Sequence, residues 1–376
     1  MSDPRQVQTF ATADAVSFLG TFALVFLAIA GLLVVDGFLA RIDRSETRTD
    51  ARRLYKEGTR LIQQSQYLEA VDRFRSAVSA ERTNAEYQRA LAAALLAAGK
   101  PKDAEAVLTE RLQRDPTDGS AALIMARALV QEGQFRAAVS YYHRAIYGQW
   151  DNDAPANRVK ARFELVDLLA SHDAKQELLA ELLPLQHEAP TDLATRRRIA
   201  RLFTAAGSPS RAIEILRTVL RQDNRDGDAY AGLGEAELER GNDRRAVQYL
   251  ETAARLAPRD PKIASELALA NQILALDPSQ RGLSLEEQLR RSRSLLEQVV
   301  LAVDSCPGAR DSLGVLQPDQ RASAAREPRS AAARQQATES NLDLAEELWD
   351  SLRRHCPGTA SLAGRPVGWV LDKIAQ

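Results

Sequence analysis

An uninterrupted apolar run near the N-terminus is the most pronounced hydropathy feature of the chain. Residues 15–35 read AVSFLGTFALVFLAIAGLLVV and contain no charged side chain. A helix of this length spans about 31 Å, which matches the ~30 Å hydrocarbon core of a bilayer. The pattern predicts a single-pass transmembrane helix, with a short tail over residues 1–14 and a juxtamembrane linker over residues 36–50.

Two alternatives to a membrane anchor stay open. A cleavable signal peptide would fit the small-x-small site at residues 28–30, but the apolar run is longer than the usual core of about 7–15 residues and continues beyond that site. The leader is also poor in positive charge, because Arg5 is set against Asp3 and Asp14. A buried helix of a soluble domain is disfavoured by the length of the run.

Basic residues beside the apolar run indicate its orientation. The N-terminal side carries Arg5, whereas the C-terminal side carries a cluster of six: Arg41, Arg44, Arg48, Arg52, Arg53 and Lys56. The positive-inside bias therefore predicts that the large C-terminal part lies in the cytoplasm. A periplasmic location is the alternative, because residues from Arg52 onward could already belong to a folded domain.

Beyond residue 50, small and large apolar residues recur every 34 residues. The order small, small, large is kept by Gly58, Ala70 and Phe74, by Ala92, Ala104 and Leu108, by Ala126, Ala138 and Tyr142, and by Gly234, Ala246 and Leu250. Breakers such as Gly99-Lys100-Pro101 divide each repeat into two helices. The small residues let those helices approach closely, and because one repeat cannot bury its apolar face alone, the repeats are expected to stack.

These positions resemble the tetratricopeptide repeat (TPR), and the repeat that begins at Gly227 matches best, with Tyr230, Leu233, Gly234, Ala246, Leu250, Ala253 and Pro258. The resemblance covers roughly residues 51–310. It implies an all-α fold in which the transmembrane helix is followed by a TPR-type α-solenoid, a right-handed superhelix of helix-turn-helix repeats with a concave groove.

The repeat frame also predicts how the chain is divided. It gives repeats 1–3 at residues 51–152, an interruption at 153–158, repeats 4–6 at 159–260, an expanded repeat 7 at 261–308, a polar loop or weak helix at 309–340, and a partial repeat with a C-terminal capping helix at 341–376. The expected starts of the six regular repeats are Ala51, Ala85, Gly119, Val159, Leu193 and Gly227.

Net charge and the absence of known motifs argue against several classes of function. The 50 Lys and Arg residues nearly balance the 51 Asp and Glu residues, so the chain has no overall basic field for nucleic acid. None of the HExxH, GxSxG, GxGxxG and GxxxxGK[ST] motifs occurs. We therefore expect no enzyme activity, no cofactor, no metal site and no nucleic-acid partner.

The resemblance also implies where a partner would bind. In this family, ligands lie along positions 2, 5, 9, 12 and 13 of the first helix of each repeat. Here those positions include Arg52, Tyr55, Arg89, Leu123, Arg127, Lys160, Phe163, Arg197 and Arg201. Arginines with interleaved aromatics suit an extended peptide of acidic or mixed charge. The competing interpretation is that these arginines are surface residues paired with acids four positions away on their own helix.

The two cysteines leave three interpretations open. Cys306-Pro307-Gly308 and Cys356-Pro357-Gly358 both follow helical segments, so the cysteines could simply be small buried residues beside helix-terminating Pro and Gly. This is the interpretation that the sequence favours. A disulfide between Cys306 and Cys356 would require an oxidising compartment and thus the opposite membrane topology. Haem or metal ligation with His355 would lack a complete ligand set.

Two functions follow from this architecture. The first is a membrane-anchored scaffold or adaptor that binds protein partners in its concave groove, without catalysis. The second is an assembly or biogenesis factor, for secretion, a pilus or a cytochrome, with the repeats in the periplasm. An enzyme within residues 309–376 is disfavoured because this stretch lacks a paired base and nucleophile.

Overall fold

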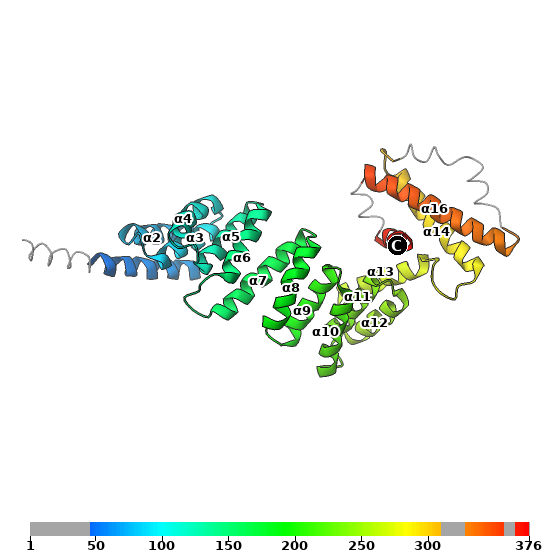
Figure 1. Ribbon diagram of the computed structural model, residues 1–376, viewed down its shortest axis with the longest axis horizontal. Helices are drawn as coiled ribbons and strands as arrows, with labels where there is room; N and C mark the ends of the chain where they lie inside the picture. Colours follow the sequence, from blue (N-terminus) through cyan, green and yellow to red (C-terminus); the bar gives the residue numbers. More distant parts are fainter. Residues whose placement is uncertain (1–45, 310–327, 357–364, 376) are drawn as a thin grey trace, which may run out of the picture. The chain divides into compact units, whose positions relative to one another are not determined.

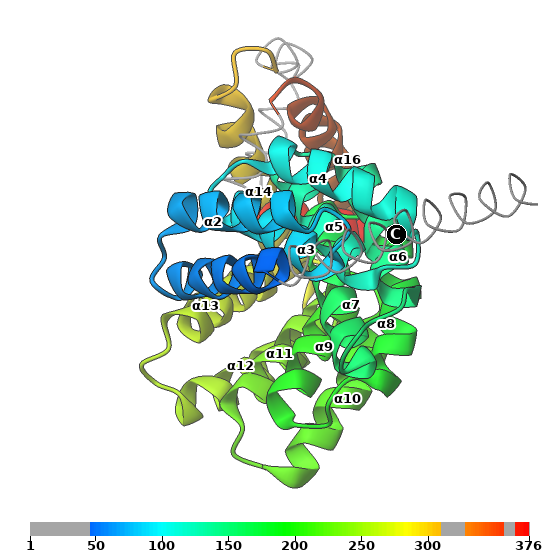
Figure 2. The same cartoon turned by 90° about the vertical axis from the view of Figure 1, so that its left-hand side faces the viewer.

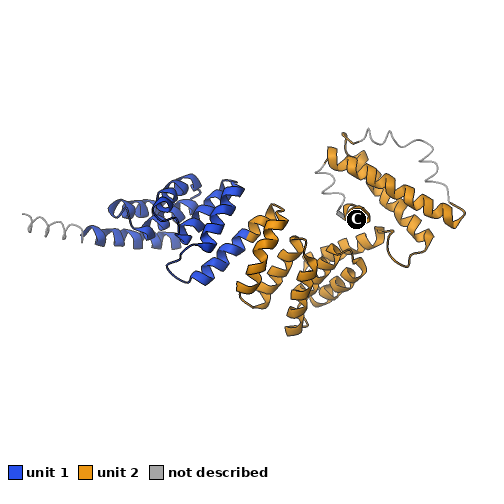
Figure 3. Ribbon diagram, viewed as in Figure 1, with its two compact units in different colours: residues 1–165 blue, residues 166–376 orange. Residues whose placement is uncertain are grey.

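The computed structural model of the protein describes residues 46–309, 328–356 and 365–375. This part of the chain is all-α, and short turns join most successive helices (Figure 1). The helices cluster into two compact units, residues 1–165 and residues 166–376 (Figure 3), here called the N-terminal and the C-terminal unit.

The N-terminal unit stacks pairs of helices. Its helices are residues 46–63, α2 (Tyr67–Ala80), α3 (Ala85–Ala97), α4 (Pro101–Arg114), α5 (Gly119–Gln131), α6 (Phe135–Tyr147) and α7 (Ala154–Ser171), which continues into the C-terminal unit. Each pair forms one repeat, and the first helices of successive repeats are neighbours, since α3 contacts α5 as well as its own partner α4.

The C-terminal unit continues the same arrangement and ends in longer helices. It contains α8 (Lys175–Glu188), α9 (Leu193–Ala205), α10 (Pro209–Gln222), α11 (Gly227–Glu239), α12 (Asp243–Leu256), α13 (Pro261–Leu276), α14 (Leu285–Asp304), α16 (Ala331–His355) and α18 (Arg365–Ile374). Here α11 contacts both α9 and α13. The long helices α14 and α16 lie side by side (Figures 1 and 2).

Polar and glycine residues set the helix ends at corresponding positions of the repeats. The first helices begin after capping side chains that accept backbone N–H bonds, namely Asn84, Asp118, Asp192, Asp226 and Asp260. Between the two helices of a repeat the chain turns through the left-handed region. Gly99, Gly133, Gly207 and Gly241 adopt this conformation with φ of 71° or 72°.

The core of each repeat follows from the small and large positions of the sequence. Gly234 and Ala246 lie where α11 and α12 cross, and Leu250 fills the space between them. A Cβ added to Gly234 would come within 2.5 Å of Leu250 Cγ, so this approach requires glycine. The large residue of the other repeats is buried in the same way, as Phe74, Leu108, Tyr142 and Leu216 show.

Several helix bounds differ from those expected. Residues 46–50, expected in the linker, are helical, and α7 begins at Ala154 rather than at Val159. The helix α16 begins at Ala331, ten residues inside the stretch expected to be a loop or weak helix. Ser330 caps it by accepting a bond from the backbone N–H of Ala333, and the alanine-rich start has a high intrinsic helix propensity.

The expected membrane anchor is not part of the described structure. Residues 15–35 lie outside the described residues. Among the helices that the structure does describe, none is both long and apolar enough to cross a bilayer.

Candidate functional site

The first helices of the repeats carry the candidate binding residues. In each of the two units, the surface that they form is called the first-helix surface below. The residues concerned are at positions 2, 5, 9, 12 and 13, counted from the expected start of each repeat and not from the first residue of the helix. In the N-terminal unit they lie on the helix over residues 46–63, on α3, on α5 and on α7, and in the C-terminal unit on α9, α11 and α13.

Arg89 on α3 is held by the carboxylate that caps the first helix of the following repeat and by a carboxylate at the end of that repeat. Its Nη1 lies 3.1 Å from Asp118 Oδ2, and its Nη2 donates to Asp151. Asp118 also accepts a bond of 2.8 Å from Arg111 Nε and caps α5 through Ala121 N. Burial opposes the charge of Arg89, but the two carboxylates raise its pKa. Arg89 therefore joins two repeats.

The same connection recurs in the C-terminal unit. Arg197 occupies in its repeat the position that Arg89 occupies in the second, and it donates to Asp226, the cap of α11. Its Nη2 also lies 3.6 Å from Asp228 Oδ2. Asp226 is 4% exposed at its side chain, so this pair is largely withdrawn from water. An Arg at position 5 and an Asp just before the next repeat thus form a repeated inter-repeat clasp.

Arg127 on α5 makes a bidentate ion pair with α7. Its Nη2 lies 2.6 Å from Glu164 Oε1, and its Nε lies 2.8 Å from Glu164 Oε2. The hydroxyl of Tyr142 donates to the same carboxylate at 3.4 Å. The bonds to Glu164 raise the pKa of Arg127, so its charge is fixed and matched within the protein.

These pairs change the electrostatics expected for the surface. The arginines are paired with acids, as the competing interpretation proposed, but the acids lie on neighbouring repeats and not four positions away on the same helix. The arginines were evident in the sequence, while their carboxylate partners were not identified as site residues. One signal was available, because Asp118 and Asp226 each stand one residue before a repeat.

The remaining candidate residues divide by exposure. Arg52, Lys160 and Arg201 are exposed, and Phe163 is half-buried. Leu123 is 5% exposed and belongs to the core more than to the surface. The ring of Tyr55 stacks on Tyr87, with centroids 5.1 Å apart, and burial raises its pKa.

Small and apolar side chains lie exposed among these paired charges. Ala93 and Ala97 occupy positions 9 and 13 of α3, and Val130 occupies position 12 of α5. Val130 is 38% exposed. The N-terminal part of the surface therefore offers neutral contacts beside charges that are already matched.

In the C-terminal unit the surface carries two neighbouring carboxyl groups. Glu235 on α11 and Glu266 on α13 interact with each other and with one cation, as Lys262 Nζ lies 3.3 Å from Glu235 Oε1 and 3.2 Å from Glu266 Oε1. Burial, together with the neighbouring Glu235, raises the pKa of Glu266 to about 7. The side chain of Glu266 therefore changes charge near neutral pH.

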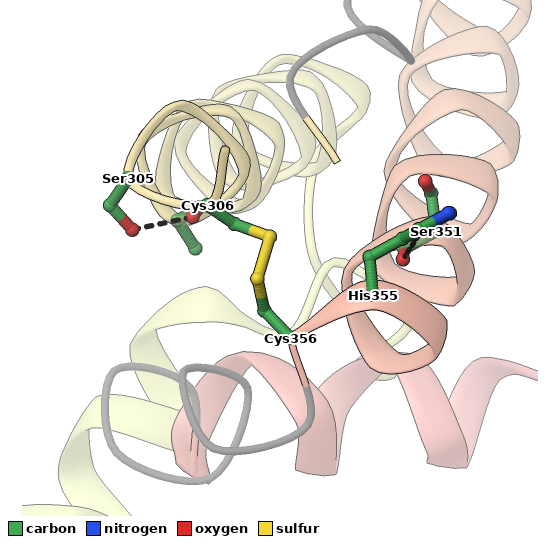
Figure 4. Close-up of a disulfide and its surroundings, with 6 residues drawn as sticks. Ser305, Cys306, Ser351, His355 and Cys356 are labelled. Carbon is green, nitrogen blue, oxygen red and sulfur yellow. Dashed lines mark hydrogen bonds between the residues drawn. A yellow bond between two sulfur atoms is a disulfide. The ribbon is translucent and has the colours of Figure 1, made fainter. Parts of the chain in front are cut away.

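The two cysteines form a disulfide that joins α14 to α16 (Figure 4). The interpretation favoured from the sequence, two unpaired buried residues, is thereby corrected. Cys306 follows the last turn of α14 and Cys356 follows α16, so two helices that lie side by side end at one covalent link. His355 Nδ1 lies 2.9 Å from the carbonyl oxygen of Ser351, and with both sulfurs bonded no haem or metal ligand set remains there.

A buried charge cluster attaches the C-terminal helix. Lys373 on α18 lies 2.6 Å from Asp243 Oδ2 and 2.7 Å from Asp277 Oδ2. Burial opposes the charge of Lys373, but the two carboxylates raise its pKa. Val367, Val370 and other apolar residues of α18 complete the core around it.

No group of three or more metal-ligating side chains occurs in the described part of the chain. Within each unit, the repeat arrangement places the first-helix surface on successive first helices, as the contacts of α3 with α5 and of α11 with α9 and α13 show.

Comparisons with known proteins identify the repeats. The family model described as tetratricopeptide repeat matches residues 61–128, 95–163 and 203–273, so the chain carries tetratricopeptide repeats. A search of curated proteins finds no match.

The following three solved structures are among those that match half of this chain or more. YrrB, described as a TPR protein with an unusual peptide-binding site, is 18% identical, covers 52% of this chain and 97% of its own, and gives a TM-score of 0.43. PilF of Pseudomonas aeruginosa is 15% identical, with 60% and 98% covered and a TM-score of 0.43. The C-terminal part of a TPR repeat-containing protein from Cytophaga hutchinsonii is 12% identical, with 81% and 96% covered and a TM-score of 0.46.

Proposed function

Because this chain carries tetratricopeptide repeats, we propose that it is a membrane-anchored scaffold that binds an extended segment of a partner protein on its first-helix surface. The observation that carries the proposal is the make-up of that surface. Exposed small and apolar side chains at ligand-binding positions of α3 and α5 lie between arginines whose charges are matched within the protein.

The paired arginines also bear on the chemistry of the partner. The sequence favoured an acidic or mixed peptide. An acidic side chain would have to compete with the carboxylates already bound to Arg89, Arg127 and Arg197. We therefore expect the partner to present small or apolar side chains to α3 and α5, with polar backbone groups toward the matched charges.

Affinity capture with paired variants tests this binding surface. The full chain, solubilised in mild detergent, serves as bait, and Ala93→Glu combined with Val130→Glu places two charges on exposed positions of the first helices. Burying unmatched carboxylates under a partner should reduce the captured amount about tenfold or more. The matched control is Ala106→Glu with Ser140→Glu, on exposed positions of α4 and α6. Equal capture by both double variants would contradict the proposed surface.

The disulfide supports a location for the repeats opposite to the one favoured by the sequence. Disulfides persist in oxidising compartments and are rare in the cytoplasm. The basic flank that favoured the cytoplasm includes Arg48, Arg52, Arg53 and Lys56, which lie in the folded helix of the first repeat, and folded domains are translocated largely regardless of charge. We propose that residues 15–35 anchor the chain and that the repeats lie on the oxidising side, the periplasm in a bacterium.

Protease access tests that location. In intact spheroplasts, protease added outside should digest the repeats, and a C-terminal reporter that functions only outside the cytoplasm should be active. Protection until the cells are lysed would place the repeats in the cytoplasm and contradict the proposal. A periplasmic location is also the one that the assembly-factor alternative requires, so the identity of the captured partner separates a general scaffold from an assembly factor.

A further inference from the structure

The first described helix carries a row of cations along one face. Arg48, Arg52, Lys56 and Arg60 follow one another at intervals of four residues in the helix over residues 46–63, and all four are exposed or nearly so. Residues four apart in a helix lie one above the other. These four residues are called the basic face. Like charges at this spacing destabilise a helix, so a bound anion would relieve a repulsion that the fold leaves in place.

The protein supplies little compensating charge to this face. A hollow of about 490 Å³ is lined by Thr49, Arg52, Arg53, Lys56, Glu57 and Arg60. Glu57 is the one carboxylate among these residues, and its Oε2 lies 3.6 Å from Arg73 Nε on α2. Arg48 pairs with Glu81 at 3.3 Å, and Arg53, which also lines the hollow, pairs with Asp50 at 3.1 Å. The other three cations that line the hollow are Arg52, Lys56 and Arg60.

Another face of the same helix is committed to packing. Ala51 and Gly58 are buried, and Tyr55 contacts Phe74 of α2 and Tyr87 of α3. The helix therefore cannot turn its cations inward without breaking the first repeat. The basic face is left to interact with something outside the described structure.

The chain sequence indicates what that is. Only residues 36–45 separate the apolar segment from the helix that carries the basic face. Eleven peptide steps reach at most about 40 Å, so an anchored chain holds the start of this helix near the bilayer surface. Bilayers rich in anionic lipid attract basic residues there, and each Lys or Arg strengthens the attraction about fivefold.

We propose that the basic face binds the anionic headgroups of the bilayer in which the chain is anchored. The hollow admits a phosphate group between Arg52, Lys56 and Arg60, and charge-assisted bonds to it would satisfy these cations together. This contact holds the first repeat at the membrane surface, so the scaffold collects its partner there. The inference rests on the proposed membrane anchor.

A photo-crosslinking experiment with the full chain tests the inference. A photo-crosslinking amino acid replaces Thr49, at the edge of the hollow, and the protein is reconstituted into vesicles of phosphatidylcholine alone or with about one third phosphatidylglycerol. Lipid adducts are identified by mass spectrometry. The test variant carries Arg52→Gln, Lys56→Gln and Arg60→Gln. The matched control carries Arg217→Gln, Arg221→Gln and Arg225→Gln, which removes the same charge from exposed positions elsewhere.

Phosphatidylglycerol adducts should predominate in the mixed vesicles, should persist in the matched control and should fall roughly a hundredfold in the test variant, as expected for three cations. Equal crosslinking to both lipids would overturn the inference. So would an unchanged amount of phosphatidylglycerol adduct in the test variant, or crosslinks to a second copy of the chain. Alkaline extraction of the same vesicles reports on the anchor separately. A chain that extraction releases contradicts the anchor, whereas a retained chain without anionic adducts contradicts only the basic-face inference.

Discussion

At the residue scale, Asp118 shows how one side chain can serve a helix end and a repeat interface together. One oxygen caps α5 at Ala121 N, and the carboxylate also receives Arg89 and Arg111. Its side chain is 2% exposed, so each partner adds an interaction that water does not weaken. Asp226 repeats the arrangement with Arg197. Asp118 and Asp226 therefore link the helices of successive repeats to each other.

Replacing Asp118 should therefore cost far more than removing a helix cap. In Asp118→Ala, Arg89 and Arg111 lose a shared buried carboxylate, and we expect the free energy of unfolding of the N-terminal unit to fall by about 3 kcal/mol or more. Asp192→Ala is the matched control, because Asp192 caps α9 through Thr195 N from an exposed position. Urea unfolding of both variants measures the difference. Similar midpoints for the two would contradict the clasp.

Glu266 should make stability depend on pH near neutrality. Its folded-state pKa of about 7 lies above the ordinary value of 4.5, so the folded protein keeps a proton that the unfolded chain releases. The stability that the protonated Glu266 contributes to the folded state is fully present below about pH 4.5 and is lost as the pH rises through 7. Thermal melting of the wild type and of Glu266→Gln at pH 5 and pH 8 measures this. The variant should gain stability relative to the wild type at pH 8, and a constant difference would contradict the assignment.

At the scale of the helices, close approach within a repeat depends on small residues at fixed positions. Gly234→Ala places a methyl group against Leu250, and overpacking of this kind costs about 1–3 kcal/mol, more than the gain of up to about 1 kcal/mol in helix propensity. Gly227→Ala, whose added Cβ would meet nothing closer than 3.5 Å, is the control. Thermal melting should show loss in the first variant and none in the second. Equal melting temperatures would contradict the expectation, because α11 and α12 would then accommodate the added methyl group with no loss of stability.

The helices were predictable from sequence where periodicity and end signals agree. α3, α5, α9 and α11 begin at Ala85, Gly119, Leu193 and Gly227, the positions where the repeat frame starts. The start of α16 was not predictable from apolar periodicity, because residues 331–340 contain no bulky apolar side chain. A tertiary contact helps to hold that region, since Asn341 Nδ2 donates to Ser292 Oγ on α14 at 3.0 Å.

The binding surface was predictable only in part, for a related reason. The repeat frame identifies which positions of the first helices face a partner, and so it named Arg89, Arg127 and Arg197. It does not identify the acids that neutralise them, because Asp118 and Asp226 lie 29 positions and Glu164 lies 37 positions along the chain from their arginines. Those pairings depend on how successive repeats stack, which local spacing does not encode.

At the scale of the whole molecule, the disulfide and the Lys373 cluster attach the last helices to the repeats. The disulfide closes a loop of 50 residues between Cys306 and Cys356, which by chain entropy alone corresponds to about 4 kcal/mol. Reduction should lower the unfolding midpoint of the C-terminal unit in urea. Cys306→Ser with Cys356→Ser should be equally destabilised and insensitive to reductant. An unchanged midpoint after complete reduction, verified by thiol titration, would contradict a structural role.

The central claim is that the scaffold binds its partner on the first helices of its repeats, and hydrogen exchange of the full chain with its captured partner tests this most directly. Binding should slow amide exchange in α3 and α5, while the paired second helices α4 and α6 exchange as before. Slowed exchange confined to the second helices, or none in any repeat, would contradict the claim.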